Sequence, residues 1–332
     1  MIAWTLDRRD IRAFVILAIF FSTLVAIAAV ILSGRAAKGD RINRLVTDKS
    51  CVQCDLDQIV LHDTDLAKVN LENSSLRNAD LTGSDLEGGN LADTILSGAI
   101  LTDSNLAYSN LQDAVLSGAV LNATQLNEAN LRGAYLGDAV LDNAMLSGAS
   151  LDDAILIRAE LNNADLRQTN LRRVDLGGAT LRLANLRRAN LIRTNLANTD
   201  LGKADLQGAD LRRSDLQHAN LSNAVLRNSN LRDANLRQAN LSNAILIRAN
   251  LLNAFLREAN LSDSELQQAD LSGAILNRTN LARANLTGTN LTGANLRRAN
   301  LQDATISAVE LANAKLCETT MPDGTISNRD CV

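Results

Sequence analysis

The sequence contains few of the residues that usually build globular cores. Among its 332 residues there is one proline, and Phe, Trp and Tyr together make up 2% of the composition. Aromatic side chains supply much of the buried area of an ordinary globular core. A core of that kind is therefore not expected, and the chain must obtain its stability in another way.

The sequence also lacks the patterns of common enzyme chemistry. It contains no P-loop, no dinucleotide-binding glycine pattern and no HExxH motif. Its two histidines, His62 and His218, are separated by 156 residues. We therefore predict that the protein is not an enzyme and that it needs neither a cofactor nor a metal ion.

The four cysteines form two pairs, Cys51 with Cys54 and Cys317 with Cys331, which frame the middle of the chain. An even number of cysteines in this arrangement favours two disulfides and an oxidising compartment. A CxxC pair also occurs in cytosolic zinc and redox sites, so reduced thiols are the second interpretation.

An uncharged run, AFVILAIFFSTLVAIAAVIL, covers residues 13–32. As a helix, about twenty apolar residues span the hydrocarbon core of a bilayer. We predict an uncleaved transmembrane helix over 13–32, with a flank at 1–12 and a basic juxtamembrane linker at 33–50. The alternative is a long signal segment that is cleaved near an A-x-A site at 26–28.

Two features of the sequence disagree about membrane orientation. Three arginines precede the apolar run, and five arginines and lysines follow it before residue 50, which favours cytoplasmic repeats. The cysteine pairs favour export. We predict a single-pass membrane protein whose repeats lie in the periplasm or thylakoid lumen, and the cytoplasm is the alternative.

What the sequence does contain is a period of five. From residue 56 to residue 316 every fifth residue is leucine in 52 of 53 cases, with Ile306 as the exception. Two residues earlier, 48 of the 53 positions hold Ala, Ser, Thr or Gly. Neither the 3.6-residue period of an α-helix nor the 2-residue period of a strand fits. A fixed short period predicts a solenoid, in which each unit buries its apolar side chain against its neighbours.

We expect each five-residue unit to form one flat side of a coil, with the leucine and the small residue pointing inward. The residue between them then points outward. It is Asn or Asp in 31 of the 53 units, and stacked amides can hydrogen-bond along such a column.

The pattern A-[DN]-L-x-x resembles that of the pentapeptide-repeat proteins, over about 80% of the chain. The resemblance implies an all-β fold, a right-handed quadrilateral β-helix with four units in each coil and about 13 coils over residues 51–316. The ends, TDKSCVQCDL at 47–56 and LCETTMPDGTISNRDC at 316–331, resemble those of cyanobacterial and plastid members. We expect a C-terminal cap at 317–332, because an open solenoid end exposes unpaired backbone.

The outward positions between 95 and 155 show a second period, of twenty residues. Two apolar residues alternate with two polar ones, and folding at twenty residues per coil places the apolar ones in two neighbouring columns. The first column is Ile95, Val115, Tyr135 and Ile155, and the second is Ile100, Val120 and Val140. We interpret them as a candidate docking strip. The alternative is that β-branched residues simply suit a stacked, extended backbone.

Charge is distributed unevenly along the repeats. Residues 51–156 contain 3 Lys/Arg and 16 Asp/Glu, a net charge of −13, and residues 157–260 contain 16 and 9, a net charge of +7. A candidate basic face consists of Arg132, Arg172, Arg173, Arg193, Arg212, Arg213 and Arg232. It is either a solvated face or a contact for anionic lipid, nucleic acid or the acidic part of another copy. The shortage of aromatic residues argues against single-stranded nucleic acid, which stacks on such side chains.

We predict a non-catalytic, membrane-tethered scaffold that presents the apolar strip and its charges to protein partners whose identity the sequence does not reveal. A second hypothesis rests on the family resemblance. Some pentapeptide-repeat proteins imitate duplex DNA and inhibit or protect gyrase, and the acidic residues 51–156 would be the mimic here. A third hypothesis is a purely structural rod that self-associates, with acidic half against basic half.

Overall fold

The structure of the chain, a computed structural model, describes residue 39 and residues 41–331. Residues 1–38 and residue 40 lie outside the described part of the chain. They include the predicted transmembrane segment at 13–32, its flank at 1–12 and residues 33–38 and 40 of the predicted linker. In the part of the chain that is described, no helix is both long enough and apolar enough to span a membrane.

The chain divides into two compact units, Met1–Ser50 and Cys51–Val332. In the first unit, residues 41–47 form a short helix within the predicted linker. The backbone amide of Asp48 extends it by one bond, donating to the Arg44 carbonyl at 2.9 Å. The second unit contains all of the repeats.

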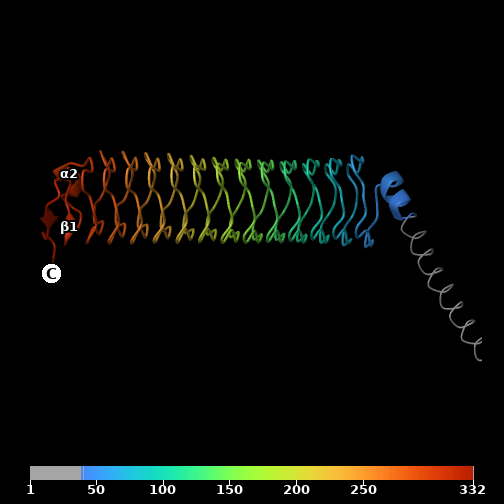
Figure 1. Cartoon of the computed structure of the whole chain (residues 1–332), viewed down its shortest axis with the longest axis horizontal. Helices are drawn as coiled ribbons and strands as arrows, with labels where there is room; N and C mark the ends of the chain where they lie inside the picture. Colours follow the sequence, from blue (N-terminus) through green and yellow to red (C-terminus); the bar gives the residue numbers. More distant parts are fainter. Residues whose placement is uncertain (1–38, 40, 332) are drawn as a thin grey trace, which may run out of the picture. The chain divides into compact units, whose positions relative to one another are not determined.

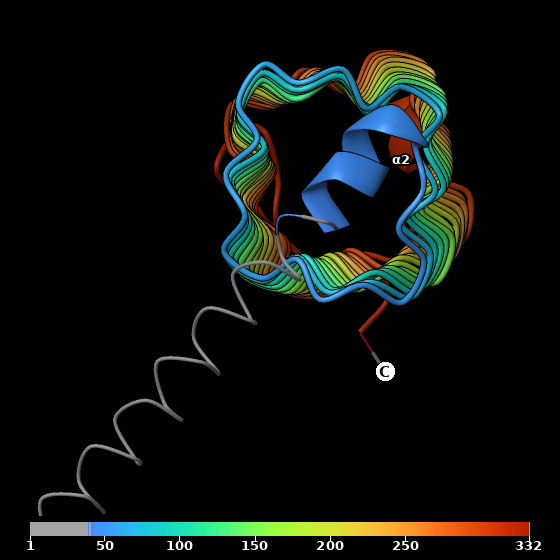
Figure 2. The same ribbon diagram turned by 90° about the vertical axis from the view of Figure 1, so that its right-hand side faces the viewer.

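The second unit is a stack of similar coils, and a view along its axis shows four sides (Figures 1 and 2). Parallel bridges join each outward residue to the residue twenty positions later, from Asp55 and Ser75 to Asn300 and Thr320. Each coil therefore contains twenty residues, and the stack has about 13 coils. The predicted β-helix of four five-residue units per coil is confirmed.

We name the four sides by their outward residues. Side A begins at Asp55, side B at Val60, side C at Asp65 and side D at Asn70, and each continues with every twentieth residue. Two corner residues separate consecutive sides. The first D–A corner after side D begins holds Glu72 and its neighbour, and the first A–B corner holds Asp57 and its neighbour.

The interior is a column of leucines and small residues on every side. All leucines of the five-residue series from 56 to 301 are buried, with Leu61 the most exposed at 8%. Burying a leucine contributes roughly 1.5–3 kcal/mol, and the repetition of this contribution replaces an aromatic core. Where the small residue is polar, its hydroxyl is satisfied by backbone, as when Ser104 donates to the Leu101 carbonyl at 2.7 Å.

Every corner uses a tight turn that requires an unusual backbone angle. The second corner residue has a positive φ in each unit from 53 to 303, for example 54° at Ala123 and 57° at Arg173. The leucine before each turn accepts a bond from the residue three positions later, as when the Ala129 amide donates to Leu126 at 3.1 Å. A positive φ at the second central residue only is the signature of a type II turn.

The expected ladders of outward amides are present. On side D the Asn110 amide donates to Asn90 at 3.1 Å, and Asn130 donates to Asn110 at 2.8 Å. On side B the Asn280 amide donates to Asn260 at 3.0 Å. Each side-chain oxygen also accepts the backbone amide two residues on, at 3.3 Å for Gln112 on Asn110. The ladders thus hold neighbouring coils together and orient the first residue of each corner.

The C-terminal end departs from the repeat. Helix α2 (Ala308–Leu311) replaces one side of a coil, starting just after the half-buried Ile306. The Glu310 carboxylate there accepts the backbone amides of Ser307 and Gly288, both at 2.5 Å. Strand β1 (Thr319–Thr320) then pairs with β2 (Ile326–Ser327) in an antiparallel arrangement. Thr320 still bridges to Asn300, so the ladder of side B runs four residues past the expected end of the repeats at 316.

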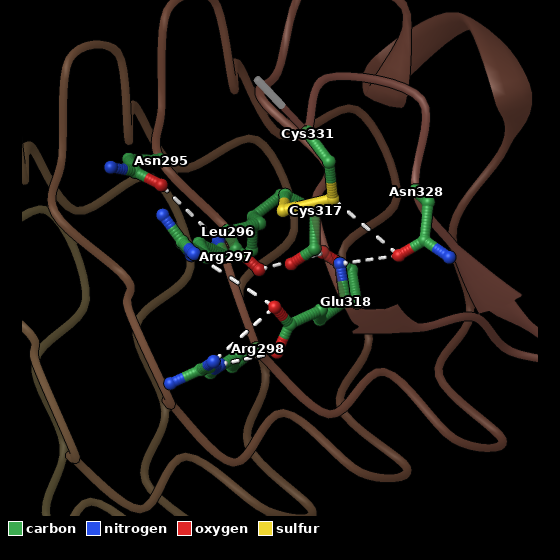
Figure 3. Close-up of polar contacts among 9 residues, drawn as sticks. Asn295, Leu296, Arg297, Arg298, Cys317, Glu318, Asn328 and Cys331 are labelled. Carbon is green, nitrogen blue, oxygen red and sulfur yellow. Dashed lines mark hydrogen bonds and ion pairs between the residues drawn. A yellow bond between two sulfur atoms is a disulfide. The ribbon is translucent and has the colours of Figure 1, made fainter.

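Both predicted disulfides are present. Cys51 is bonded to Cys54, and Cys317 is bonded to Cys331 across the C-terminal cap (Figure 3). Around the second disulfide, Asn328 accepts the Glu318 backbone amide at 3.1 Å, and the Arg298 guanidinium of the previous coil binds the Glu318 carboxylate at 2.5 Å. The disulfide therefore closes the cap on itself, and the ion pair attaches the cap to the preceding coil.

Candidate interaction surfaces

Within the described residues, no group of three or more His, Cys, Asp and Glu side chains could hold a metal ion. His62 Nε2 lies 2.7 Å from Asp80 Oδ2 of the next coil, and 53% of the histidine side chain is exposed. The largest hollows among the described residues are open to solvent. The features that distinguish this rod are therefore surfaces.

The predicted apolar strip lies on two adjacent sides. Side A contains the bridged series Ile95, Val115, Tyr135 and Ile155, and side B contains Ile100, Val120 and Val140. Tyr135 is 40% exposed, Ile100 39% and Ile155 37%, while the other four are half-buried. These side chains stack on one another along the axis and still present apolar surface to solvent.

The A–B corner between the two columns carries mainly small residues from residue 97 to residue 137. It carries Ser97, Gly98, Ser117, Gly118 and Gly137, and the second residue of the last of these turns is Asp138. The Ser117 hydroxyl donates to the Ser97 hydroxyl at 2.9 Å, and a Cβ added at Gly118 would meet nothing within 4 Å. The two apolar columns are thus joined across a corner without long side chains. We call the seven strip residues and these five corner residues the apolar face.

Tyr135 shows why glycine is needed at one corner position. A Cβ at Gly137 would lie 2.8 Å from the tyrosine Oη and 2.9 Å from its Cζ, so the ring lies against this glycine. Gly137 is the first residue of its corner, where φ is not positive. The backbone therefore does not demand glycine there, and the adjacent aromatic ring does.

An ion pair bounds the apolar face toward the C-terminus. Arg158 donates to Asp138 of the preceding coil through Nε at 2.7 Å and through a terminal nitrogen at 2.6 Å. This bidentate contact holds the pKa of the Asp138 carboxyl below its ordinary value and raises the pKa of Arg158. The next two coils of this corner carry small or neutral residues again, Gly177, Gly178, Ala197 and Asn198, and an arginine returns at Arg237.

The sequence predicted the seven apolar residues of this face and missed its corner. The missed signal is the recurrence of Ser97 at Ser117 and of Gly98 at Gly118, twenty residues apart. It becomes visible only when the sequence is written in twenty-residue rows. Whether the apolar face binds a partner stays a prediction.

The predicted basic face lies at the D–A corner. A hollow of about 400 Å³ there is lined by Arg172, Ile192, Arg193, Arg212, Arg213, Arg232 and Asp233. Five of the seven predicted arginines are therefore brought together. The other two, Arg132 and Arg173, occupy the same corner and do not line the hollow.

Carboxylates engage some of these arginines. Arg173 binds Asp153 of the preceding coil at 2.5 Å, which lowers the pKa of that carboxyl. Arg212 binds Asp210 at 2.6 Å. Asp233 lies 3.7 Å from Arg213 and 3.6 Å from Arg232.

Three arginines of the corner lack such a partner. Among residues 41–331, Arg132, Arg172 and Arg193 form no ion pair. The corner is therefore left with excess positive charge exposed to solvent.

Comparison with protein families gives one match. The family described as pentapeptide repeats matches overlapping segments that run from 54–93 to 284–321. A search of curated proteins finds no match.

Solved structures give further similarities. HetL, a pentapeptide-repeat protein involved in heterocyst differentiation regulation from Nostoc sp. strain PCC 7120, is 28% identical, with 86% of this chain and 98% of that chain covered and a TM-score of 0.30. The Nostoc pentapeptide-repeat protein alr5209 is 33% identical over 36% of this chain and 82% of its own, with a TM-score of 0.25. QnrB1, a plasmid-mediated fluoroquinolone resistance protein, is 20% identical over 57% and 91%, with a TM-score of 0.28.

Proposed function

The chain belongs to the pentapeptide-repeat family, and from that premise we propose that it is a non-catalytic rod whose apolar face binds protein partners. In this proposal residues 13–32 tether the rod to a membrane. The observation that carries it is the apolar face itself, in which two apolar columns with three exposed members are joined across a corner of small residues. A contiguous exposed apolar patch on a soluble surface is typical of an interaction site.

Stability alone does not account for this face. Outward positions elsewhere are filled mainly by Asn and Asp, whose ladders already hold the coils together. Later coils of the A–B corner carry long residues such as Gln217 and Arg237, so the backbone accepts large side chains there. Small residues at the corner of the apolar face add no buried area. They make the surface flat, which suits a partner with an extended or planar apolar surface.

The test uses side-chain changes on and off the face. Val115→Asp and Tyr135→Asp place a charge at its centre and should abolish binding of its partners. Ile275→Asp is the matched control, because Ile275 is an outward residue of the same side and is 36% exposed. Proteins that co-purify with the full chain from its own membranes would be quantified for each variant. Equal recovery with the parent and both face variants, all folded by circular dichroism, would exclude the proposal.

A second pair of variants tests the corner of small residues without burying charge. Gly118→Arg adds a long side chain where a Cβ meets nothing, and arginine is already accepted at positive φ at Arg158 and Arg173. Gly293→Arg is the control, since a Cβ at Gly293 also meets nothing and its φ is 71°. We expect partner binding to fall at least tenfold for the first variant only.

The tether and its orientation are tested with a bulky maleimide on intact membranes, before and after reduction. The two disulfides support an oxidising location, the periplasm or thylakoid lumen. We expect the four cysteines to react only after reduction and without breaking the membrane. Labelling without reduction, and only after the cell is opened, would place the repeats in the cytoplasm. Release of the protein by high salt or carbonate would contradict the tether.

The acidic half is poorly suited to the alternative role of a DNA mimic. Between residues 95 and 155, sides A and B present apolar residues where a mimic needs anionic ones. The acidic residues there lie on the remaining sides and corners. An assay of gyrase supercoiling with the purified full chain tests this alternative directly, and inhibition below about equimolar protein would revive it.

A further inference from the structure

The D–A corner carries charged residues in nine successive coils. The charges of the ninth, Arg232 and Asp233, cancel, and the order of the net charges in the first eight is unusual. From the N-terminus the coils hold, in turn, Glu72, Asp93, Asp113, Arg132, the pair Asp152 and Asp153, the pair Arg172 and Arg173, Arg193, and the pair Arg212 and Arg213. All of these residues sit at corner positions that are exposed or half-buried. The signs therefore run negative three times, positive, negative, and positive three times.

This series changes sign when it is read backwards. The first coil is negative where the eighth is positive, and the same holds for the second and seventh, the third and sixth, and the fourth and fifth. We infer that two copies of the chain pair side by side and antiparallel along their D–A corners. The two-fold axis passes between the coil of Arg132 and the coil of Asp152. This goes beyond the proposed docking function, which uses sides A and B.

Four different contacts follow from this register, and the two-fold axis repeats each of them. Glu72 faces Arg212 and Arg213 of the second copy, and Asp93 faces Arg193. Asp113 faces Arg172 and Arg173, and Arg132 faces Asp152 and Asp153. All eight coils then have an oppositely charged partner.

Other registers bring like charges together. If one copy slides by one coil in one direction, Arg132 faces its own counterpart and Asp113 faces Asp152 and Asp153. A slide by one coil in the other direction sets Arg132 against Arg172 and Asp153 against its counterpart. The order of charges therefore selects one register as well as an antiparallel orientation.

The backbone keeps these contacts in phase. Both partners have the same rise of about 4.8 Å per coil, so opposite charges stay aligned over eight coils, roughly 40 Å. In an antiparallel pair, side D also faces side D. Its outward residues in the first seven of these coils, from Asn70 to Asn190, are asparagine with one serine, Ser150, and bring no charge to this contact. The eighth is Asp210, whose carboxylate is paired with Arg212 of its own chain at 2.6 Å.

The charges that would meet are incompletely paired within one chain. In the described residues, Glu72, Asp93 and Asp113 form no ion pair, and neither do Arg172 and Arg193. A separate polyanion would account for the arginines and leave the acidic half of the corner unexplained. A second copy accounts for both halves.

The association is expected to be electrostatic and strongly dependent on salt. A single exposed ion pair contributes little, and the proposed contact depends on many pairs acting together. The screening length is about 10 Å at 0.1 M salt and about 3 Å at 1 M. We expect the full chain in detergent to be a dimer at low salt, about 0.02 M, and a monomer at about 1 M, where screening is strongest. Sedimentation equilibrium measures both states.

A charge swap tests the register. Asp93→Arg sets two arginines against each other at both copies of one contact, and Arg193→Asp does the same with two aspartates. Each variant alone should weaken dimerisation at least tenfold. An equimolar mixture of the two should form a heterodimer, because the arginine introduced in one chain then faces the aspartate introduced in the other, and the second copy of the contact keeps its native pair. The double variant Asp93→Arg/Arg193→Asp should form homodimers again.

The control places the same change on the diagonally opposite corner. Asp103→Arg has the same charge difference and the same positive-φ position, 58° against 55° at Asp93, and should leave dimerisation unchanged. A parent that is monomeric at low salt overturns the inference. So does failure of the mixture to associate, or an equal loss with Asp103→Arg, which would indicate net charge alone. An effect of Arg193→Asp without one of Asp93→Arg would also overturn it and would indicate a separate anionic ligand.

Failure of this inference can be told from failure of the docking proposal. Ile100→Asp, on side B, should abolish partner binding and leave the dimer intact. The charge-reversal variants should have the opposite pattern.

Discussion

Residues 51–156 and residues 157–260 have the same backbone and opposite surfaces. Both halves have twenty-residue coils, buried leucines and the same turns. One has a net charge of −13 and the apolar face, and the other has a net charge of +7 and the arginine hollow. The comparison shows that in this fold the inward residues maintain the structure while the outward residues are free to encode recognition.

The largest expected effect tests whether the two interiors are equivalent. Leu136→Ala in the acidic half and Leu216→Ala in the basic half each remove a side chain that is 0% exposed. Each should lower the free energy of unfolding by about 2–5 kcal/mol, because a cavity remains in a rigid stack. Urea denaturation followed by circular dichroism measures it. A difference of more than about 2 kcal/mol between the halves would show that surface charge also influences the core.

The two ends of the rod should respond unequally to loss of their disulfides. Cys317 and Cys331 are separated by 14 residues, whereas Cys51 and Cys54 are separated by 3. The chain-entropy model gives about 3 kcal/mol for a loop of the larger size and less for a shorter one. Two variants are compared by thermal unfolding, one with both C-terminal cysteines and one with both N-terminal cysteines replaced by serine. The C-terminal variant should have the lower melting temperature. The reverse order would contradict this account.

A smaller effect is expected at the corner turns. Ala123 has a φ of 54°, a region that costs an ordinary residue about 1–2 kcal/mol. Glycine populates this region freely but loses more entropy on folding, so Ala123→Gly should raise stability by up to about 1 kcal/mol. Gly118→Ala, at a φ of 62° in the neighbouring unit, should lower it by a similar amount. Matched melting curves of the two variants decide the sign.

The smallest effect concerns pH and the ion pair that bounds the apolar face. Because the Arg158 guanidinium lowers the pKa of Asp138, the folded state binds a proton there less readily than the unfolded chain. The contribution of this pair is present above the ordinary carboxyl pKa of about 3.9 and is lost as pH falls through the lower, folded value. Asp138→Asn should therefore flatten the acid limb of the stability curve slightly, and Asp103→Asn should change it less.

Much of the candidate surfaces followed from the sequence alone. The outward apolar residues and the seven arginines recur at multiples of twenty, so their alignment required only the coil length. The corner of small residues was missed because its glycines and serines resemble ordinary turn residues in a linear reading. The helix 41–47 and the departure at α2 were also missed, since both interrupt the five-residue pattern instead of following it.

The sequence by itself determined the parts of this protein that repeat. A leucine every fifth residue with a small companion allows one way of burying apolar surface, and this determines the coils and the outward columns. The two cysteine pairs mark where the series begins and ends. The tertiary structure alone decided which neighbours meet across coils. Tyr135 lies against Gly137, and Arg173 binds Asp153. The Glu310 carboxylate accepts the backbone amide of Gly288 at the point where α2 interrupts the coil. These contacts depend on the direction of side chains from a turn with positive φ, and a one-dimensional period contains no information about direction.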